Sequence, residues 1–525
     1  MSKQLAKNTL IFSLMTFISR MLGFVRDMVV AYLFGVTGAA DAFWVAFKIP
    51  NFMRRLFAEG SFSQAFIPVL AEYKETHDPQ VVRDFISHMM ASLGLVLLLL
   101  TLFVELATPL ITVLFAPGYL HDPHRFHLSS EMLHLTFPYL FFISLTAFFG
   151  SILNTYGRFG IPAFTPALLN ICMILTAVWL TPHCAEPVMA LAWGVFIAGV
   201  VQCVFQIPFL IRQGLLPLPR LRWKDPGVRR VLKLMVPAIF GVSVGQINLL
   251  IDTVFASFLP VGSISWLYYS DRLTSFPLGV FGVAISTVVL PSLAKAFSRK
   301  SHEDYNATVD WALRMVLLIS LPATFAFLML AIPFLSTLFQ HGGFKEHDVL
   351  MSASSLCMFA LGIPGFMLIK VLASGFYARQ NIKKPVKIAV VAMVANTLMS
   401  VALIFPMAHA GLALSTSISS TLNAGMLFYG LVKAGFYQPG SHWRRFGLQM
   451  LAANSVMCVL LWIFNDAPEV WFAASNQWRG LHLTGLCVLA MVSYFIVLWA
   501  LGLRPKDFIF LESSSKDSKE AASSL

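Results

Sequence analysis

Long apolar runs recur along the chain and limit its possible folds more than any other feature. Stretches such as 94–103 and 316–331 carry apolar side chains on every face. As helices, runs of about twenty residues reach across a hydrocarbon core of roughly 30 Å. Spanning strands would be about ten residues long and would alternate in polarity, which excludes a porin-like barrel. Because 58% of the residues are hydrophobic and only 12% are charged, we predict an all-α polytopic membrane protein rather than a soluble fold.

The apolar runs divide the chain into about fourteen expected transmembrane helices. We place these helices at 8–34, 39–58, 84–115, 131–156, 162–181, 186–212, 230–258, 265–295, 308–338, 348–378, 385–408, 410–436, 446–465 and 480–503. Lys3 and Lys7 precede the first run as in a signal peptide, but Arg20 and Arg26 interrupt it and no small-residue cleavage site follows. We therefore expect the first run to remain as a membrane span.

Basic residues in the connecting segments predict the orientation in the membrane. The segment 212–233 between the sixth and seventh spans is rich in Arg and Lys, whereas the next segment, 259–264, has neither. Cytoplasmic loops carry the excess of Lys and Arg, so both termini are predicted to be cytoplasmic. Only Arg125, Lys345 and Arg479 then fall outside. The polar tail from Ser513 is expected to be disordered.

An internal repeat with an offset of about 222 to 225 residues divides the spans into two halves. Asp27 aligns with Asp252, the segment 66–73 aligns with 289–297, and Tyr156 aligns with Tyr377. Six spans separate the copies, so the two lobes share an orientation and are related by an axis along the membrane normal, with the site between them. We predict lobes at 1–220 and 221–440, two additional helices at 441–505 and a cytoplasmic tail at 506–525.

Charged and polar side chains form stripes on several expected spans. Residues spaced by three and four share one face of a helix. The first span has a stripe of Ser13, Thr16, Arg20, Gly23 and Asp27, flanked by Ser19 and Arg26. The second has Asp41, Lys48, Asn51, Arg55 and Glu59, with Arg54 beside them and Pro50 expected to bend the helix. The eighth has Ser265, Tyr268, Arg272, Ser275 and Gly279, next to Asp271.

These charges predict a cavity that binds an anion. Each Arg or Lys at the bilayer centre costs roughly 2.5–3.5 kcal/mol, so the side chains must face protein or water. One explanation is a set of structural ion pairs, such as Arg20 or Arg26 with Asp41. Cations outnumber carboxylates on these spans, however, and the planar fork of arginine suits phosphate and carboxylate groups. We therefore predict substrate-binding roles for Ser19, Arg20, Arg26, Lys48, Asn51, Arg54 and Arg272, and gating or cavity roles for Asp27, Asp41, Arg55, Glu59 and Asp271.

A second polar group suggests ion coupling. Asp252 lies in the middle of the seventh span, and the repeat places Asn396 and Thr397 in the same lobe. Their oxygens suit sodium, and a buried carboxylate is able to carry a proton instead. A polar bridge between helices is an equal alternative.

Other functional classes find little support in the sequence. The outer segment 121–134 contains four histidines, which we interpret as a solvated loop rather than a metal site. Nucleotide-binding and hydrolase motifs are missing from the sequence, so we expect neither an enzyme nor a bound cofactor. The net charge of +12 is spread over short loops and predicts no nucleic-acid binding.

Several segments resemble the MurJ (MviN) family of lipid II flippases. The resemblance is carried by SRMLGFVRDMVVAYLFG (19–35), DAFWVAFKIPNFMRRLFAEGSFSQAFIPVLAEY (41–73), FASFLPVGSISWLYYSDRL (255–273) and GFYARQNIKKPVKIA (375–389). It implies a MATE-like fold of two six-helix lobes and two extra helices. It also implies a cationic cavity that binds the pyrophosphate of the substrate, with Arg20, Arg26, Arg54 and Arg272 at the matching positions.

The resemblance further implies a function in cell-wall synthesis. Members of the family move undecaprenyl-pyrophosphate-linked MurNAc-pentapeptide-GlcNAc across the bacterial cytoplasmic membrane, with lipid II and membrane lipids as partners and with contacts to division and elongation proteins to be expected. Sodium, a proton or the membrane potential would reset the transporter. The alternatives are a flippase for another polyprenyl-linked oligosaccharide, a MATE-type exporter, or a membrane scaffold that transports nothing.

Overall fold

The computed structural model describes residues 3–56, 62–216 and 218–504. The regular secondary structure of these residues is helical, so the predicted all-α fold is confirmed. Packing divides the chain into two compact units. The first comprises Met1–Ser265 with His341–Phe344, and the second comprises Trp266–Gln340 with Lys345–Leu525. The predicted lobes follow the internal repeat rather than packing, and their boundaries stay a prediction.

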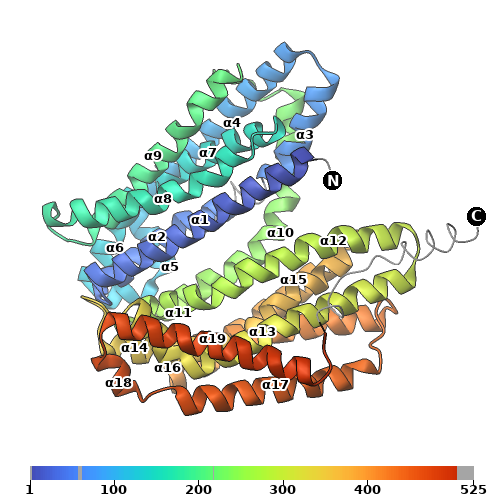
Figure 1. Ribbon diagram of the computed structural model, residues 1–525. Coiled ribbons are helices and arrows are strands. Elements are labelled where there is room, and N and C mark those ends of the chain that lie inside the picture. The colour runs from blue at the N-terminus through green and yellow to red at the C-terminus, as the bar shows by residue number, and fades with distance from the viewer. Residues whose placement is uncertain (1–2, 57–61, 217, 505–525) are drawn as a thin grey trace, which may run out of the picture. The chain divides into compact units, whose positions relative to one another are not determined.

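The first unit contains ten α-helices, drawn from blue to green in Figure 1. They are α1 (Lys3–Phe34), α2 (Gly38–Met53), α3 (Ser63–Thr76), α4 (Pro79–Leu106), α5 (Thr108–Phe115), α6 (Pro123–Thr136), α7 (Tyr139–Thr155), α8 (Gly160–Trp179), α9 (Met189–Arg212) and α10 (Pro226–Ala256). Two short helices, η2 (Pro117–His121) and η3 (Thr181–His183), lie in the connections. In this unit α8 packs against both α1 and α9.

The second unit contains the remaining helices, and α11 begins in the last residues of the first unit. They are α11 (Ser263–Pro277), η4 (Leu278–Gly282), α12 (Val283–Ser298), α13 (His302–Leu338), α14 (Glu346–Ala360), α15 (Ile363–Tyr377), α16 (Lys383–Lys433), α17 (His442–Phe464), α18 (Pro468–Ala473) and α19 (Asn476–Ala500). α17 and α19 lie side by side (Figure 1). Buried residues from α13, α17 and α19 form one core with Trp471 of α18.

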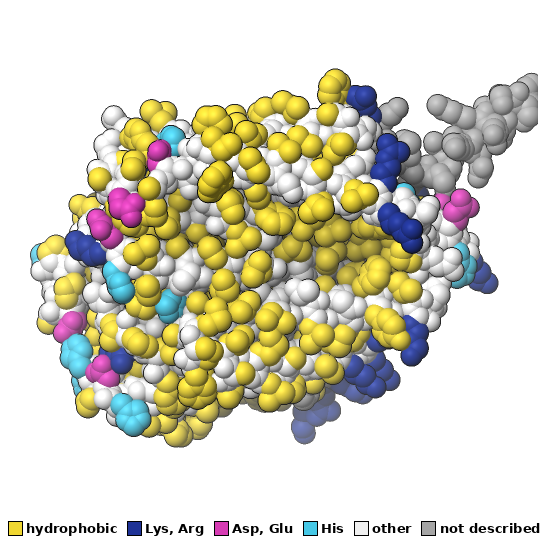
Figure 2. Space-filling view, turned by 90° about the horizontal axis from the view of Figure 1, so that it is seen from below, with side chains coloured by type: hydrophobic (Ala, Val, Ile, Leu, Met, Phe, Trp, Pro, Cys, Tyr) yellow, Lys and Arg dark blue, Asp and Glu magenta, His cyan; other side chains and the backbone are white. Residues whose placement is uncertain are grey.

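Apolar side chains cover the outer surfaces of both units. Nine helical segments in the described part of the chain are long and apolar enough to cross a membrane. On α4, Phe103 is 61% exposed and Leu106 is 88% exposed, and Trp462 of α17 is 77% exposed. Figure 2 shows a broad apolar band, with most Lys and Arg beyond one edge and most Asp, Glu and His beyond the other. Apolar surface of this extent requires lipid rather than water as its solvent.

The helices differ from the expected spans in three places. α3 fills a stretch left outside the spans, because Phe62, Phe66 and Leu70 recur at helical spacing and are buried. The expected eighth span is divided by a short π-helix, η4. The single long helix α16 has a non-helical residue, Ala408, with φ at 47° and ψ at −127°. Ala408 lies where we divided 385–408 from 410–436. The total of fourteen spans stays a prediction.

Arg479, expected on the outer side, is a buried structural residue. Its side chain is 5% exposed in the structure. The guanidinium donates to the carbonyls of Trp471 and Phe472, both at 2.7 Å, and to those of Ser336 and Gln340, both at 3.2 Å. The last carbonyls of a helix lack partners within the helix, so Arg479 caps the end of α13 and joins it to α18 and α19.

Replacing Arg479 with alanine should destabilise the second unit. The change leaves four buried carbonyls without their charged donor, and a loss of about 3 kcal/mol in the free energy of unfolding is expected. The melting temperature of the purified protein measures this loss. The matched control is Arg444→Ala on α17, whose side chain is exposed. Equal melting temperatures for the two variants would contradict the capping role.

Candidate functional site

Arg26 and Asp27 form a buried ion pair on α1. Asp27 is fully buried and Arg26 is 6% exposed. Nε and Nη2 of Arg26 donate to Oδ1 of Asp27 at 2.9 and 2.6 Å, and Nη1 lies 3.8 Å from the sulfur of Met173 on α8. The sequence placed Arg26 only at the flank of the stripe that contains Asp27. Because the pair is desolvated and partly neutralised, Arg26 must change partner before it contacts a substrate.

The other stripe residues of α1 face its contact with α8 to different extents. Gly23 is buried, and Ser19 and Arg20 are half-buried. The carbonyl of Ser19 accepts a hydrogen bond from Asn170 Nδ2 of α8 at 3.0 Å. The polar face of α1 therefore serves partly as a packing surface inside the first unit. The side chain of Ser13 lies outside the described residues.

Asp41 joins the start of α2 to the segment that leads into α11. The residue is 1% exposed. Its Oδ2 accepts the amide of Gly262 at 2.6 Å, and its Oδ1 accepts the amide and the hydroxyl of Ser265 at 2.9 and 2.6 Å. These short bonds to a carboxylate are stronger than neutral hydrogen bonds. The suggested ion pair of Asp41 with Arg20 or Arg26 is therefore replaced by a set of hydrogen bonds, which we call the Asp41 latch.

The second half of α2 directs its polar side chains toward several neighbours. Lys48 Nζ donates to Thr253 Oγ1 of α10 at 3.3 Å. Arg54 Nε donates to Oδ1 of Asn51 at 3.2 Å, and Nη1 of Arg55, just after α2, donates to Gln246 Oε1 of α10 at 3.4 Å. Three cationic side chains, of Lys48, Arg54 and Arg55, therefore lie within eight residues of one another on and just after α2. Glu59, predicted on the same face, lies outside the described residues.

The remaining predicted residues are distributed over both units. Asp271 is exposed and Arg272 is half-buried on α11, in the second unit. Asp252 is half-buried on α10 in the first unit, whereas Asn396 and Thr397 lie on α16 in the second. The grouping of Arg272 with the cations of α1 and α2 therefore stays a prediction. The cation site of Asp252, Asn396 and Thr397 likewise stays a prediction.

Glycines hold residues 341–344 against the end of α1. The amide of Gly343 donates to the carbonyl of Tyr32 at 2.8 Å. A Cβ atom on Gly35 would overlap the carbonyl of Gly343, and one on Gly342 would overlap the carbonyl of Tyr32. Gly35 and Gly342 also adopt φ values of 57°, which other residues rarely adopt. This contact belongs to the first unit and was not predicted from the sequence.

Sequence reasoning also missed two buried glutamines on α9. Gln202 and Gln206 are each 1% exposed and line a cavity within the first unit that Arg54 also borders. Their spacing of four residues inside an apolar run places both on one face of a helix. This spacing is the sequence signal that could have identified the two glutamines as a polar pair facing the interior.

The outer histidines are distributed among different partners. His134 Nδ1 lies 2.7 Å from Glu105 Oε2, and His127 Nδ1 lies 3.4 Å from Glu131. Nearby, the amide and guanidinium of Arg125 hydrogen-bond to Asp122 and lower the pKa of its carboxyl. In the described ranges, no three His, Cys, Asp or Glu side chains gather as metal ligands.

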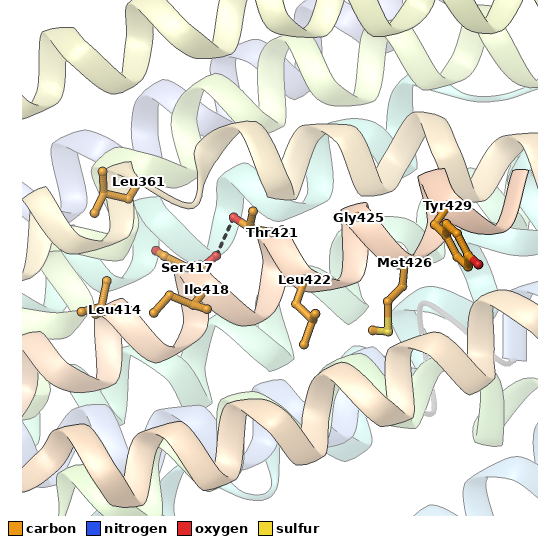
Figure 3. A pocket seen from close by; sticks show the side chains of 9 residues that line it. All are labelled: Leu361, Leu414, Ser417, Ile418, Thr421, Leu422, Gly425, Met426 and Tyr429. Carbon is orange, nitrogen blue, oxygen red and sulfur yellow. Dashed lines mark hydrogen bonds between the residues drawn. The ribbon is translucent and has the colours of Figure 1, made fainter. Parts of the chain in front are cut away.

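An apolar groove lies along α16 in the second unit. It has a volume of about 590 Å³ and is lined from Leu414 to Tyr429, with Leu361 opposite. Figure 3 shows that its polar atoms are few and that Thr421 bonds to the carbonyl of Ser417 on the same helix, at 3.0 Å. The groove carries no charged side chain, so it suits a hydrocarbon chain and not an anionic group.

Comparisons with known proteins agree over most of the chain. Residues 30–481 match the family described as lipid II flippase MurJ. A probable lipid II flippase MurJ of Haemophilus influenzae is 47% identical over 503 residues, which cover 93% of this chain and 98% of that protein. A lipid II flippase MurJ of Burkholderia cenocepacia is 40% identical over 502 residues, which cover 93% of this chain and 96% of that one.

Solved structures show the same architecture. A lipid II flippase MurJ in an inward closed conformation aligns with a TM-score of 0.79 and 26% identity, covering 93% of this chain and 98% of that chain. An inward-facing multidrug resistance MATE transporter of the MOP superfamily aligns with a TM-score of 0.68 and 14% identity, covering 81% of this chain and 98% of that chain, which supports a shared fold alone. The chain belongs to the MurJ family of lipid II flippases.

Proposed function

We propose that this chain is a lipid II flippase that moves the polyprenyl-pyrophosphate-linked peptidoglycan precursor from the inner to the outer leaflet. Membership of the MurJ family and nine apolar helical segments in the described part make it a multi-pass inner-membrane protein. The observation that carries the proposal is the group of cations on and beside α2. Lys48, Arg54 and Arg55 lie on or just after α2, in a segment that the sequence places within the membrane, and Lys48 and Arg54 are half-buried there.

The chemistry of these side chains fits an anionic head group. A pyrophosphate presents several acceptor oxygens, and arginine binds such groups with two parallel hydrogen bonds. Hydroxyl and amide groups bind the sugars and the peptide. The isoprenoid chain needs no polar route, because it remains in lipid beside the helices while the head group crosses.

The Asp41 latch supports a cycle of alternating access. Its bonds join the start of α2 to Gly262 and to Ser265 in the first turn of α11, on the side predicted to face outward. A carboxylate held by three donors makes a firm contact that still exchanges for water when the outer side opens. In this cycle Asp41 is a gating residue and does not bind substrate.

The finer features of the transport cycle are also proposals. The basic segment between α9 and α10 supports cytoplasmic termini. Asp252, Asn396 and Thr397 are proposed to bind sodium or carry a proton that resets the inward-facing state, with the membrane potential as a second driving force. No catalytic step is required of the chain. Proteins of cell-wall synthesis and division are the proposed partners.

Two other functions compete with this one. A flippase for another polyprenyl-linked oligosaccharide would use the same cations, whereas an exporter of cationic drugs needs acidic side chains in its cavity. A scaffold that transports nothing would use its charges only to hold helices together. The Arg26–Asp27 pair fits such a role, whereas the excess of cations over carboxylates on the charged spans favours the binding of an anion.

Depletion of the chain in cells that lack another lipid II flippase should trap lipid II on the inner leaflet. Restoring the chain with Lys48→Met should leave outward exposure reduced about tenfold, because loss of one charge-assisted contact costs roughly 1.5–3 kcal/mol. Probes that label lipid II only on the outer leaflet measure the exposure.

Arg220→Gln is the matched control for Lys48→Met. It removes one positive charge from an exposed loop outside the expected spans, and it should restore exposure fully at an equal membrane level. If depletion left lipid II fully exposed outside, the proposed function would be wrong. Full activity of Lys48→Met would exclude Lys48 from substrate binding.

Asp41→Asn should loosen the latch. The neutral amide offers one acceptor oxygen, and its NH₂ group faces the amides of Gly262 and Ser265, so the latch should weaken by about 2 kcal/mol. Hydrogen exchange at those two amides should accelerate by roughly thirtyfold. Asp78→Asn is the control, because the Asp78 side chain makes no capping bond at the start of α4. Unchanged exchange in Asp41→Asn would remove the latch from the proposed cycle.

A further inference from the structure

Two cations of the α2 segment are each held by a neutral side chain of α10. Lys48 Nζ donates to Thr253 Oγ1 at 3.3 Å, and Arg55 Nη1 donates to Gln246 Oε1 at 3.4 Å. Lys48 and Arg55 are seven residues apart, and Gln246 and Thr253 are also seven residues apart. Seven residues make about two helical turns, so each pair lies on one side of its helix. The two contacts therefore follow an antiparallel register of α2 and α10.

The same register continues toward the start of α2. A Cβ atom on Gly38 would lie 3.7 Å from Cγ1 of Val261. The Asp41 latch joins the first turn of α2 to Gly262 and Ser265. The start of α2 thus meets the residues that follow α10, as an antiparallel arrangement requires. The position of Lys48 opposite Thr253 is therefore set by the fold of the first unit and not by one contact alone.

α10 is fixed to the first unit at both ends. At its start, Asp225 Oδ1 accepts the amide of Gly227 at 2.8 Å, and Asp225 Oδ2 lies 2.9 Å from His88 Nδ1 of α4. Just after its end, Ser257 Oγ accepts the amide of Gly118 in η2 at 3.0 Å. These contacts hold the backbone of α10 in place, so its side chains are able to orient the cations of α2.

Thr253 presents an oriented acceptor to Lys48. Thr253 is 2% exposed, and its hydroxyl donates to the carbonyl of Leu249 at 2.7 Å. Because the single hydroxyl hydrogen is used there, the oxygen acts toward Lys48 only as an acceptor. A lysine ammonium carries three hydrogens, and this bond involves one of them. The bond therefore restrains the lysine side chain without itself neutralising the charge.

Gln246 has the corresponding relation to Arg55. Its amide oxygen is neutral and accepts from one nitrogen of the guanidinium, which has five N–H donors in all. A carboxylate at the same place would instead form a charge-assisted pair, which an anion would have to displace. Long cationic side chains lose rotamer freedom when they bind a ligand. A neutral acceptor that restrains them beforehand reduces this loss.

We propose that Thr253 and Gln246 are positioning residues, which orient Lys48 and Arg55 for the anionic head group without touching it. The proposal rests on the proposed function, because it explains how the cations of the α2 segment are held ready for the substrate. It assigns part of the control of substrate affinity to α10, although the cations themselves belong to α2 and the residues after it. It also explains why neutral acceptors, rather than carboxylates, suit these two positions.

Saturation of lipid II transport by the purified full-length chain in vesicles tests the role of Thr253. Thr253→Val keeps the shape of the side chain but removes the acceptor. The half-saturating concentration of lipid II should rise about fivefold, because Lys48 must then be ordered during binding, and the maximal rate should change less. Thr253→Ser keeps the hydroxyl and should stay close to the wild type.

Thr101→Val is the matched control for Thr253→Val. Thr101 is also buried in the first unit, and its hydroxyl donates to the carbonyl of Leu97, four residues earlier, at 2.8 Å. It lies on α4, away from the proposed cations, so saturation should be unchanged. The melting temperature of each variant establishes that it is folded.

Double variants separate positioning from a general effect on the fold. In a Lys48→Met background, Thr253→Val should cause no further rise in the half-saturating concentration, because the side chain that it orients is already gone. In an Arg55→Met background, the rise of about fivefold should persist. A purely structural role of Thr253 would give the same rise in both backgrounds.

Gln246 allows a second, graded test. Gln246→Leu removes the acceptor, and the half-saturating concentration should rise about threefold. Gln246→Glu keeps an acceptor but adds a negative charge that competes with the head group for Arg55, so a rise of about tenfold is expected. A smaller effect of Gln246→Glu than of Gln246→Leu would contradict the requirement for a neutral acceptor.

The outcomes distinguish this proposal from the proposed function. Transport with unchanged saturation in folded Thr253→Val, or an equal rise in Thr253→Ser, would overturn the positioning role and leave the flippase function standing. No transport of lipid II by the folded wild type would overturn the proposed function and the positioning role together.

Discussion

The shortage of water in the membrane is the constraint on which the rest of the structure depends. Within hydrocarbon each polar group must find its partner in the protein. Arg479 donates hydrogen bonds to four backbone carbonyls. Asp41 accepts hydrogen bonds from two amides and a hydroxyl. Arg26 forms an ion pair with the neighbouring Asp27. The contacts of Arg479 and Asp41 also join helices or fix a helix end, so buried charge contributes to the fold here.

The same constraint separates structural charges from those available to a substrate. The charge of Arg26 is already partly balanced by that of Asp27. Lys48 donates to Thr253 and Arg55 to Gln246, and these bonds, at 3.3 and 3.4 Å, are long. A pyrophosphate would form charge-assisted hydrogen bonds with such cations, which are stronger than bonds to a neutral oxygen. The proposed function therefore places anion recognition chiefly on α2 and on Arg54 and Arg55.

The hydrophobic pattern of the sequence predicted the helical fold well, because a segment that crosses lipid must satisfy its own backbone hydrogen bonds and be long enough to span the hydrocarbon core. Apolar length identified the helical segments, and the division placed after residue 408 coincides with the non-helical Ala408. Asp41 and Lys48 of the predicted stripe, and Arg54 beside it, are buried or half-buried, while their predicted roles at the site stay predictions.

The sequence predicted the helix face of a polar residue better than the residue that it contacts. Spacing along a helix shows which residues share a face but not what faces them across 200 residues, as between Lys48 and Thr253 or Asp41 and Ser265. The stripe drew attention to charges, so the uncharged Gln202 and Gln206 were overlooked. The contact of Gly35 with Gly343 depends on backbone geometry, which no pattern of side chains reveals.

The most direct measurement is transport of fluorescent lipid II by the purified chain in lipid vesicles. The proposed function predicts that lipid II on one leaflet becomes accessible to a quencher on the other, faster than in empty vesicles and faster than with a folded variant that lacks the positive charges of Lys48, Arg54 and Arg55. Equal rates for the wild type, that variant and empty vesicles would contradict it.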